Sequence, residues 1–189
     1  MKVISQVLVL VALLGSALSA RAEGVRRFGL MIDAGVPDGA NASLVFRPLG
    51  WLRVHAGGGT NLVSPGIRAG VSVLPLSFIS LNVDGGHYFP GNANNLAQTI
   101  SGDETIDVPA LRDVGYDYAN FHVGLELGGS VMQFYVHGGM SYLAGSVKNL
   151  GPTLNQSLDS EGMVTVSEDP RIRAWAVSAR VGLIFYIIP

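Results

Sequence analysis

The chain has 189 residues, a net charge of −2 and 14% charged residues, whereas an ordinary soluble domain has about a quarter. It contains no cysteine, which excludes disulfides, thiolate metal sites and cysteine nucleophiles. No basic stripe runs along the chain, so we do not expect a nucleic-acid partner.

Residues 1–22 have the pattern of a secretory signal peptide. Lys2 supplies the positive start, Val7–Leu14 form an apolar core, and Ala20-Arg21-Ala22 gives an A-x-A cleavage pattern. The apolar stretch is too short for a spanning helix, which needs about 20 residues. We therefore expect cleavage before Glu23 and a single domain over residues 23–189.

Eight segments with alternating apolar and polar residues follow. They lie at about residues 26–35, 40–47, 51–59, 66–73, 78–87, 117–127, 131–143 and 172–188. In each segment the charges fall almost always opposite the aliphatic face. Repeated alternation over about 10 residues is typical of strands in a transmembrane β-barrel. No later stretch is apolar enough for a spanning helix, and only helices and closed barrels satisfy every backbone group in lipid.

The connections between the segments support the same fold. The turns around Pro48, Pro75 and Gly128 are short, whereas residues 90–115 and 144–170 form long acidic connections. If the N-terminus lies in the periplasm, the three short turns are periplasmic and both long connections are extracellular, as in outer-membrane barrels. We predict an all-β, eight-stranded antiparallel up-and-down transmembrane β-barrel in a bacterial outer membrane.

Charged residues fall on the face that this fold turns inward. The interior of an eight-stranded barrel is only wide enough for side chains to fill it, and buried charges are costly unless they are paired. We therefore expect a lumen filled by a charge network, in which Glu126 is the shared counter-ion of Arg47, Arg53 and Arg180 in the periplasmic half. Its members are Arg47, Arg53, Arg68, Asp84, Glu126 and Arg180, and Arg27 and Asp33 share the inward phase. A gate or narrow ion pathway is the alternative.

The residues do not indicate catalysis. His55, His122 and His137 lie singly on separate segments, so we expect lumen histidines and no zinc site. No G-x-S-x-G motif occurs, and no serine is placed to join Asp84 and His87. We expect no enzyme, no metal and no cofactor; a lipid-modifying enzyme is a further alternative, as is a soluble lipocalin-like barrel with apolar faces inward.

Aromatic residues cluster at the ends of the segments, which predicts a belt at each membrane interface. The expected periplasmic belt contains Phe28, Phe46, Trp51, Phe78, Phe185 and Tyr186. The expected outer belt contains Tyr88, Phe89, Tyr116, Tyr118, Tyr142 and Trp175.

The last segment carries the pattern Arg180-x-Gly182-x-x-Phe185-x-Ile187. This resembles the C-terminal β-signal of outer-membrane proteins, although the chain ends in Ile188-Pro189 and not in phenylalanine. With its signal peptide and eight segments, the chain resembles the small eight-stranded outer-membrane proteins, the OmpA- and OmpX-like barrels. The resemblance implies insertion by the barrel-assembly machinery and a structural, adhesive or defensive role. We expect a monomer whose partners are outer-membrane lipids and, during biogenesis, that machinery.

Overall fold

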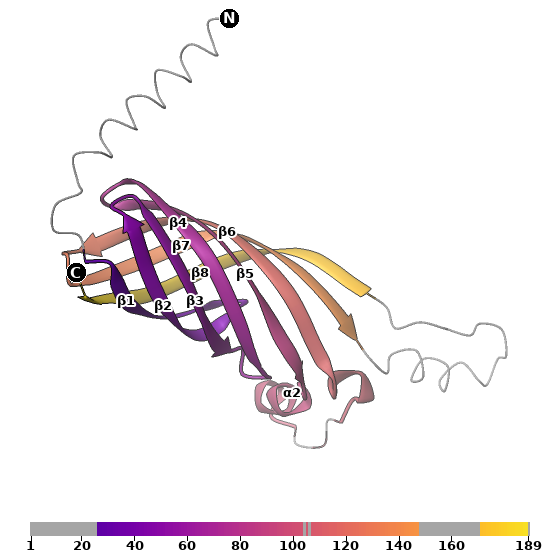
Figure 1. Cartoon of the computed structure of the whole chain (residues 1–189). Helices are drawn as coiled ribbons and strands as arrows, with labels where there is room; N and C mark the ends of the chain where they lie inside the picture. Colours follow the sequence, from indigo (N-terminus) through magenta and orange to yellow (C-terminus); the bar gives the residue numbers. More distant parts are fainter. Residues whose placement is uncertain (1–25, 104, 106, 148–170, 189) are drawn as a thin grey trace, which may run out of the picture.

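The computed structural model describes residues 26–103, 105, 107–147 and 171–188. In this part of the chain, eight antiparallel strands form a closed up-and-down barrel, in which β8 pairs with β1 (Figure 1). The strands are β1 (Phe28–Val36), β2 (Gly39–Leu49), β3 (Leu52–Thr60), β4 (Pro65–Leu76), β5 (Ile79–Gly91), β6 (Val114–Gly128), β7 (Met132–Val147) and β8 (Arg171–Ile188). The predicted all-β, eight-stranded antiparallel fold is confirmed. The expected signal peptide, residues 1–22, lies outside the described residues.

The two ends of the barrel differ in their connections. One end, here called the termini end, holds Phe28, Ile188 and three short turns, at residues 50–51, 77–78 and 129–131. The other, the loop end, holds the Pro37–Asp38 turn, residues 61–64 and the connections from β5 to β6 and from β7 to β8. Pro48 and Pro75, which we expected in turns, lie within β2 and β4. Each is near the end of its strand, where the register shifts and a missing ladder donor is tolerated.

Aliphatic side chains cover the outside of the barrel and charged ones fill the inside. Leu81, Val123 and Val181 are 48%, 59% and 44% exposed. Arg53, Arg68 and Arg180 are only 1%, 4% and 3% exposed. This polarity follows from the period of two, because successive side chains of a strand point to opposite faces of the wall.

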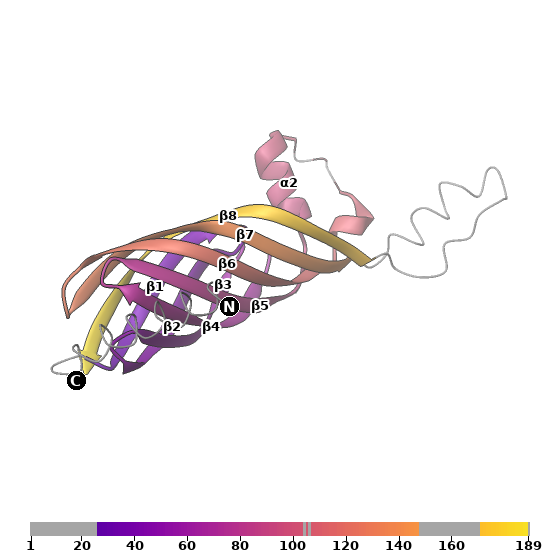
Figure 2. The same cartoon turned by 90° about the horizontal axis from the view of Figure 1, so that it is seen from above.

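The wall is taller on one side. Pairing of β1 with β8 ends at Val36 and Ala179, but the ladder of β7 with β8 continues to Ser146 and Arg171. Pairing of β6 with β7 likewise reaches Val114 and Val147, so both strands are longer than predicted. Figures 1 and 2 show β7 and β8 extending at the loop end. In these extra residues the apolar/polar alternation is interrupted by small residues, so the sequence pattern did not predict them as strand. Backbone hydrogen bonds do not require alternation, and the strands therefore continue.

The long connection from β5 to β6 is partly helical. It contains α2 (Asn94–Ser101), which Figure 2 shows beside the loop end, and the 3-10 helix η1 (Pro109–Leu111). Asn94 ties the two parts of the connection together, since its side chain exchanges hydrogen bonds with the backbone of Val108 and donates one to Asp107. Among the described residues, neither helix has the length and apolarity to cross a membrane.

Candidate functional site, the charged lumen

Eight charged side chains of the described residues are buried inside the barrel. They are the arginines Arg47, Arg53, Arg68 and Arg180 and the acids Asp33, Asp38, Asp84 and Glu126. Four positive and four negative groups balance, which is what a closed interior requires, because an uncompensated buried charge is very unfavourable.

Arg180 of β8 is the centre of the loop-side cluster, which consists of Asp33, Asp38, Arg68, Asp84 and Arg180. Its Nη1 and Nη2 donate to the two carboxylate oxygens of Asp84 over 3.1 and 2.9 Å. Its Nη2 also forms an ion pair with Asp38, and its Nε lies 3.7 Å from Asp33 Oδ1. Two-point binding by a guanidinium fixes the geometry of the carboxylate as well as its charge.

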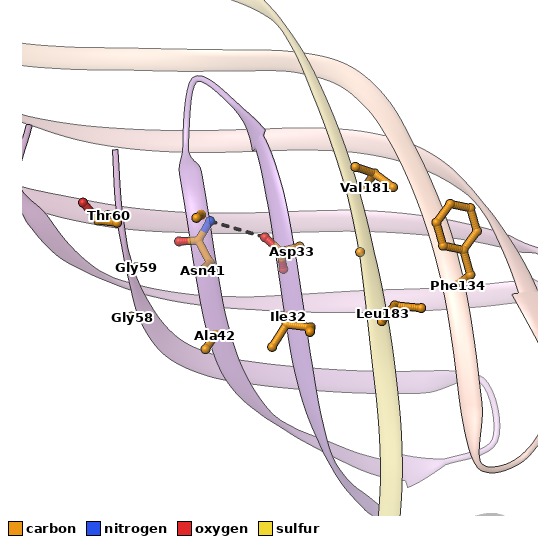
Figure 3. Close-up of a pocket in the computed structure, with 12 residues that line it drawn as sticks. Ile32, Asp33, Asn41, Ala42, Gly58, Gly59, Thr60, Phe134, Val181 and Leu183 are labelled. Carbon is orange, nitrogen blue, oxygen red and sulfur yellow. Dashed lines mark hydrogen bonds between the residues drawn. The ribbon is translucent and has the colours of Figure 1, made fainter. Parts of the chain in front are cut away.

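Arg68 of β4 binds the third acid of this cluster. Its Nη1 donates to Asp33 Oδ1 over 2.9 Å, its Nη2 pairs with Asp33 Oδ2, and its Nε donates to Ser43 Oγ over 2.9 Å. Asn41 on the neighbouring strand also donates to Asp33 Oδ1, over 3.3 Å (Figure 3). All three guanidinium nitrogens of Arg68 therefore contact side-chain oxygens inside the lumen.

Asp38 reaches the lumen from a turn and not from a strand. The Pro37–Asp38 turn folds into the mouth of the barrel, where Tyr116 donates to the Pro37 carbonyl over 3.1 Å and Asn41 to the Asp38 carbonyl over 3.0 Å. Tyr88 donates to the same Asp38 carbonyl. The sequence predicts only a turn at this aspartate, because period-two alternation does not show where a turn residue points.

The termini-side cluster consists of Arg53, Ser80, Glu126, Gln133 and His137. Arg53 of β3 forms an ion pair with Glu126 of β6, and its Nη1 lies 3.5 Å from Gln133 Oε1. His137 Nε2 lies 3.1 Å from Ser80 Oγ and 3.8 Å from Glu126 Oε1. The partners Ser80, Gln133 and His137 were not assigned to the predicted network.

The ion pairs of both clusters cross the lumen. Arg53–Glu126 joins β3 to β6, Arg68–Asp33 joins β4 to β1, and Arg180–Asp84 joins β8 to β5. None of these strand pairs is hydrogen-bonded in the sheet. The three pairs therefore connect separate parts of the wall through the interior, and they fill the cross-section with fixed charge.

Two arginines expected in the lumen lie outside the ion-pair clusters, and one expected ion pair is not formed. Arg47 lies at the termini end, where its Nη2 donates to the Gly50 carbonyl over 2.6 Å and its guanidinium lies 5.7 Å from the centre of the Tyr186 ring. Arg27, expected inward, is exposed because it precedes β1. Glu126 is not the counter-ion of Arg180, since Arg180 pairs with Asp38 and Asp84; the prediction of one shared acid was wrong.

The histidines do not form a recognisable catalytic or metal site. Ser80 and Glu126 both approach Nε2 of His137, whereas a hydrolytic triad needs the acid on the other ring nitrogen. His122 Nε2 lies 2.7 Å from Ser178 Oγ, and the rings of His122 and His137 are 6.3 Å apart. In the part of the chain that the structure describes, no three His, Asp or Glu side chains are grouped to hold a metal ion.

The aromatic residues divide between the two faces of the wall. Tyr88, Tyr118 and Tyr186, which we expected in the belts, are buried in the lumen. Phe28 and Phe46 stack at 4.7 Å near the termini end. Trp175 is 60% exposed and lies 5.2 Å from Tyr142, ring centre to ring centre, nearer the loop end. Beyond Trp175 on the loop side, the outer wall becomes charged, with Asp117 and Arg173 exposed.

The four residues of the β-signal pattern have different surroundings. Arg180 belongs to the loop-side cluster, and Gly182 lies opposite Asp33, where a Cβ atom would come within 2.6 Å of the Asp33 Cβ. Phe185 is half-buried in the wall and Ile187 is exposed. The first two residues thus serve the lumen, and the last two face outward or lie in the wall.

Comparisons of the chain with family models, with curated proteins and with solved structures found no match.

Proposed function

We propose that this chain is an integral protein of a bacterial outer membrane, which spans the bilayer with its barrel and turns its loop end outward. The observation that carries the proposal is the polarity of the wall, with aliphatic residues outside and paired charges inside. In water such a surface would be a large exposed apolar patch, whereas in lipid a closed barrel with this surface satisfies every backbone group. A soluble lipocalin-like barrel would need the opposite arrangement.

The height of the apolar wall agrees with this proposal. On β7, Phe134, Val136 and Met140 face outward between Met132 and Tyr142. At about 3.4 Å per residue and a strand tilt of about 40°, that stretch rises about 25 Å along the barrel axis. Outer-membrane barrels have an apolar band of about 25 Å between their aromatic girdles. The rings of Phe28 and Phe46 lie near one edge of this band and Trp175 near the other.

The role that fits the lumen is structural or cell-surface interaction without transport or catalysis. Three ion pairs link opposite parts of the wall, which supports a charge-plugged interior and disfavours a porin-like channel. The loop end carries the helix α2 and exposed polar residues such as Asp103, Asp107 and Arg112. Loops held on a rigid scaffold are the usual place for recognition.

The proposal includes the biogenesis and the partners of the barrel. Residues 1–22 act as the export signal, and Arg180, Gly182, Phe185 and Ile187 act as the β-signal for the barrel-assembly machinery. The inserted protein is a monomer whose other partners are outer-membrane lipids, and it has no cofactor.

Single cysteines test the location, because the chain has none of its own. Asp103→Cys lies at the loop end and Gly129→Cys at the termini end, and both positions are exposed. A membrane-impermeant maleimide should label Asp103→Cys on intact cells and Gly129→Cys only after the outer membrane is permeabilised. Equal labelling of both on intact cells, or recovery of the protein in the soluble fraction, would refute the proposal.

A further inference from the structure

The outer wall is not uniformly bulky. Over β1–β4 it is hollowed by a shallow groove of about 640 Å³ near the termini end. Ala56 and Ala69, which pair with each other, form its floor, and Phe28, Leu44 and Phe46 stand along its sides. At a similar depth on the opposite side of the barrel, β6 presents the large exposed side chains of Val123 and Leu125.

A second groove, of about 680 Å³, adjoins the first on its loop side. Its floor contains the paired residues Ala42 and Gly58, and Gly58 is the next outward-facing position of β3 after Ala56 in the first groove. Figure 3 shows Ala42 and Ile32 on neighbouring strands, with Leu183 and Phe134 beyond them. The two hollows together form one apolar track along the outer wall.

The track spans most of one leaflet. From Phe46 to Ala42 is about 14 Å along β2, which at a strand tilt of about 40° is a rise of about 10 Å along the barrel axis. Half the hydrocarbon core of a bilayer is about 15 Å thick. A flexible acyl chain entering beside Phe28 and Phe46 would therefore reach the second groove before the centre of the membrane.

The entrance to the track lies beside two arginines. Arg26 and Arg27 lie there beside Phe28, and Arg27 is exposed. Outside the lumen, the acidic residues that the structure describes all lie at the loop end, namely Asp103, Asp107, Asp113 and Asp117. The entrance to the track is therefore positive. A positive entrance complements the phosphate of an anionic lipid.

We infer that this track, here called the lipid track, binds one acyl chain of an anionic phospholipid from the leaflet at the termini end, with Arg27 paired to its phosphate. The inference rests on the proposed membrane location. A second copy of the chain would present the same concave face, and two concave faces leave a void between them.

The test uses tryptophan fluorescence in vesicles. Trp51 and Trp175 are the two tryptophans of the chain, so both are replaced by phenylalanine, and Phe46→Trp then reports from the entrance of the track. Leu125→Trp, exposed on β6 at a similar depth, is the matched reporter on the other wall. Vesicles of phosphatidylcholine receive a small fraction of either brominated phosphatidylglycerol or brominated phosphatidylcholine, whose bromines quench a nearby indole.

Brominated phosphatidylglycerol should quench Phe46→Trp at a mole fraction about fivefold lower than brominated phosphatidylcholine, the factor for about 1 kcal/mol per basic residue at an anionic surface. At Leu125→Trp the two lipids should act equally. Arg27→Gln should abolish the preference, and so should Ala56→Leu, which fills the floor. Ala119→Leu, outward on β6 and away from both grooves, should not.

Each other outcome has a defined meaning. Equal quenching by the two lipids at Phe46→Trp would overturn the lipid track and leave the membrane proposal standing. Quenching at Leu125→Trp alone would also overturn it, because the track would then be covered, as by a second copy. Absence of quenching at both reporters would overturn the membrane location itself.

Discussion

Arg180 of β8 binds Asp84 of β5 through two hydrogen bonds across the lumen, and Asp38 shares the same Nη2 atom. Removing this guanidinium leaves three carboxylates with Arg68 alone in the loop-side cluster. We therefore expect Arg180→Met to lower the free energy of unfolding by about 3–5 kcal/mol, the usual effect of breaking a buried pair. Urea titration of protein refolded into vesicles measures this without the assembly machinery.

Two further variants separate charge from packing at this position. Arg180→Met combined with Asp84→Leu should recover part of the loss, since replacing both partners of a buried pair is often neutral. Arg173→Met changes an exposed arginine of the same strand and should stay within about 0.5 kcal/mol of the parent. Equal stability of Arg180→Met and Arg173→Met would contradict the role given to the loop-side cluster.

The Arg53–Glu126 pair predicts the electrical behaviour of the barrel. Because this pair and the two loop-side pairs cross the lumen, the unmodified protein should carry no steady current in planar bilayers. The double variant Arg53→Ala/Glu126→Ala removes the two charged side chains that fill the lumen of the termini-side cluster, and it should increase the conductance. A steady open-channel current through the unmodified protein would contradict the plug and favour the porin-like alternative.

Two adjacent glycines of β7 offer a matched test of packing. A Cβ atom on Gly139 would overlap the carbonyl oxygen of Phe121 and approach the His122 backbone, whereas one on Gly138 would meet nothing within 4 Å. Gly139→Ala should therefore destabilise the barrel by about 1–3 kcal/mol, as overpacking does, and Gly138→Ala should not. Chemical unfolding of both variants decides the point, and equal effects would count against this packing of β6 and β7.

The loop that contains Asp107 and Arg112 should depend on pH only in acid. The hydrogen bonds from Arg112, together with its charge, lower the pKa of the exposed Asp107 carboxyl below its ordinary value. A lowered folded-state pKa means that the pair contributes above the unfolded pKa and is lost as the pH falls through the lowered one. Carboxyl NMR titration should give Asp107 a higher midpoint in Arg112→Gln; an unchanged midpoint would show that the pair is absent in solution.

The strand period predicted which face each lumen residue would take, but it did not identify its partner. Alternation places Arg53 and Glu126 on the inner face, because side-chain direction repeats every two residues. Which arginine meets which acid depends on the stagger of strands that are distant in sequence, and a single strand does not contain that information. For this reason Arg180 was assigned to Glu126, whereas the structure pairs it with Asp84 and Asp38.

The remaining differences come from the strand ends. Asp38 lies in a turn, where there is no phase to read, and Tyr88 and Tyr118 were assigned to a belt from their position near a strand end alone. By alternation along their strands, Tyr88 and Tyr118 face the same side as Asp84 and Asn120, and the structure places them in the lumen. The helix α2 was missed because residues 94–101 mix polar and apolar residues over only two turns, and so short a helix depends on tertiary contacts.

Nitroxide scanning along β6 tests the inside-out polarity most directly. Cysteine substitutions at residues 119–127 are labelled one at a time in vesicles, and collisions with oxygen and with a water-soluble nickel chelate are measured. Spin labels at residues 121, 123 and 125 should collide with oxygen and not with the chelate, and labels at 120, 122 and 124 should collide weakly with both. Strong collisions with the chelate at residues 121, 123 and 125 would place this wall in water and contradict the membrane assignment.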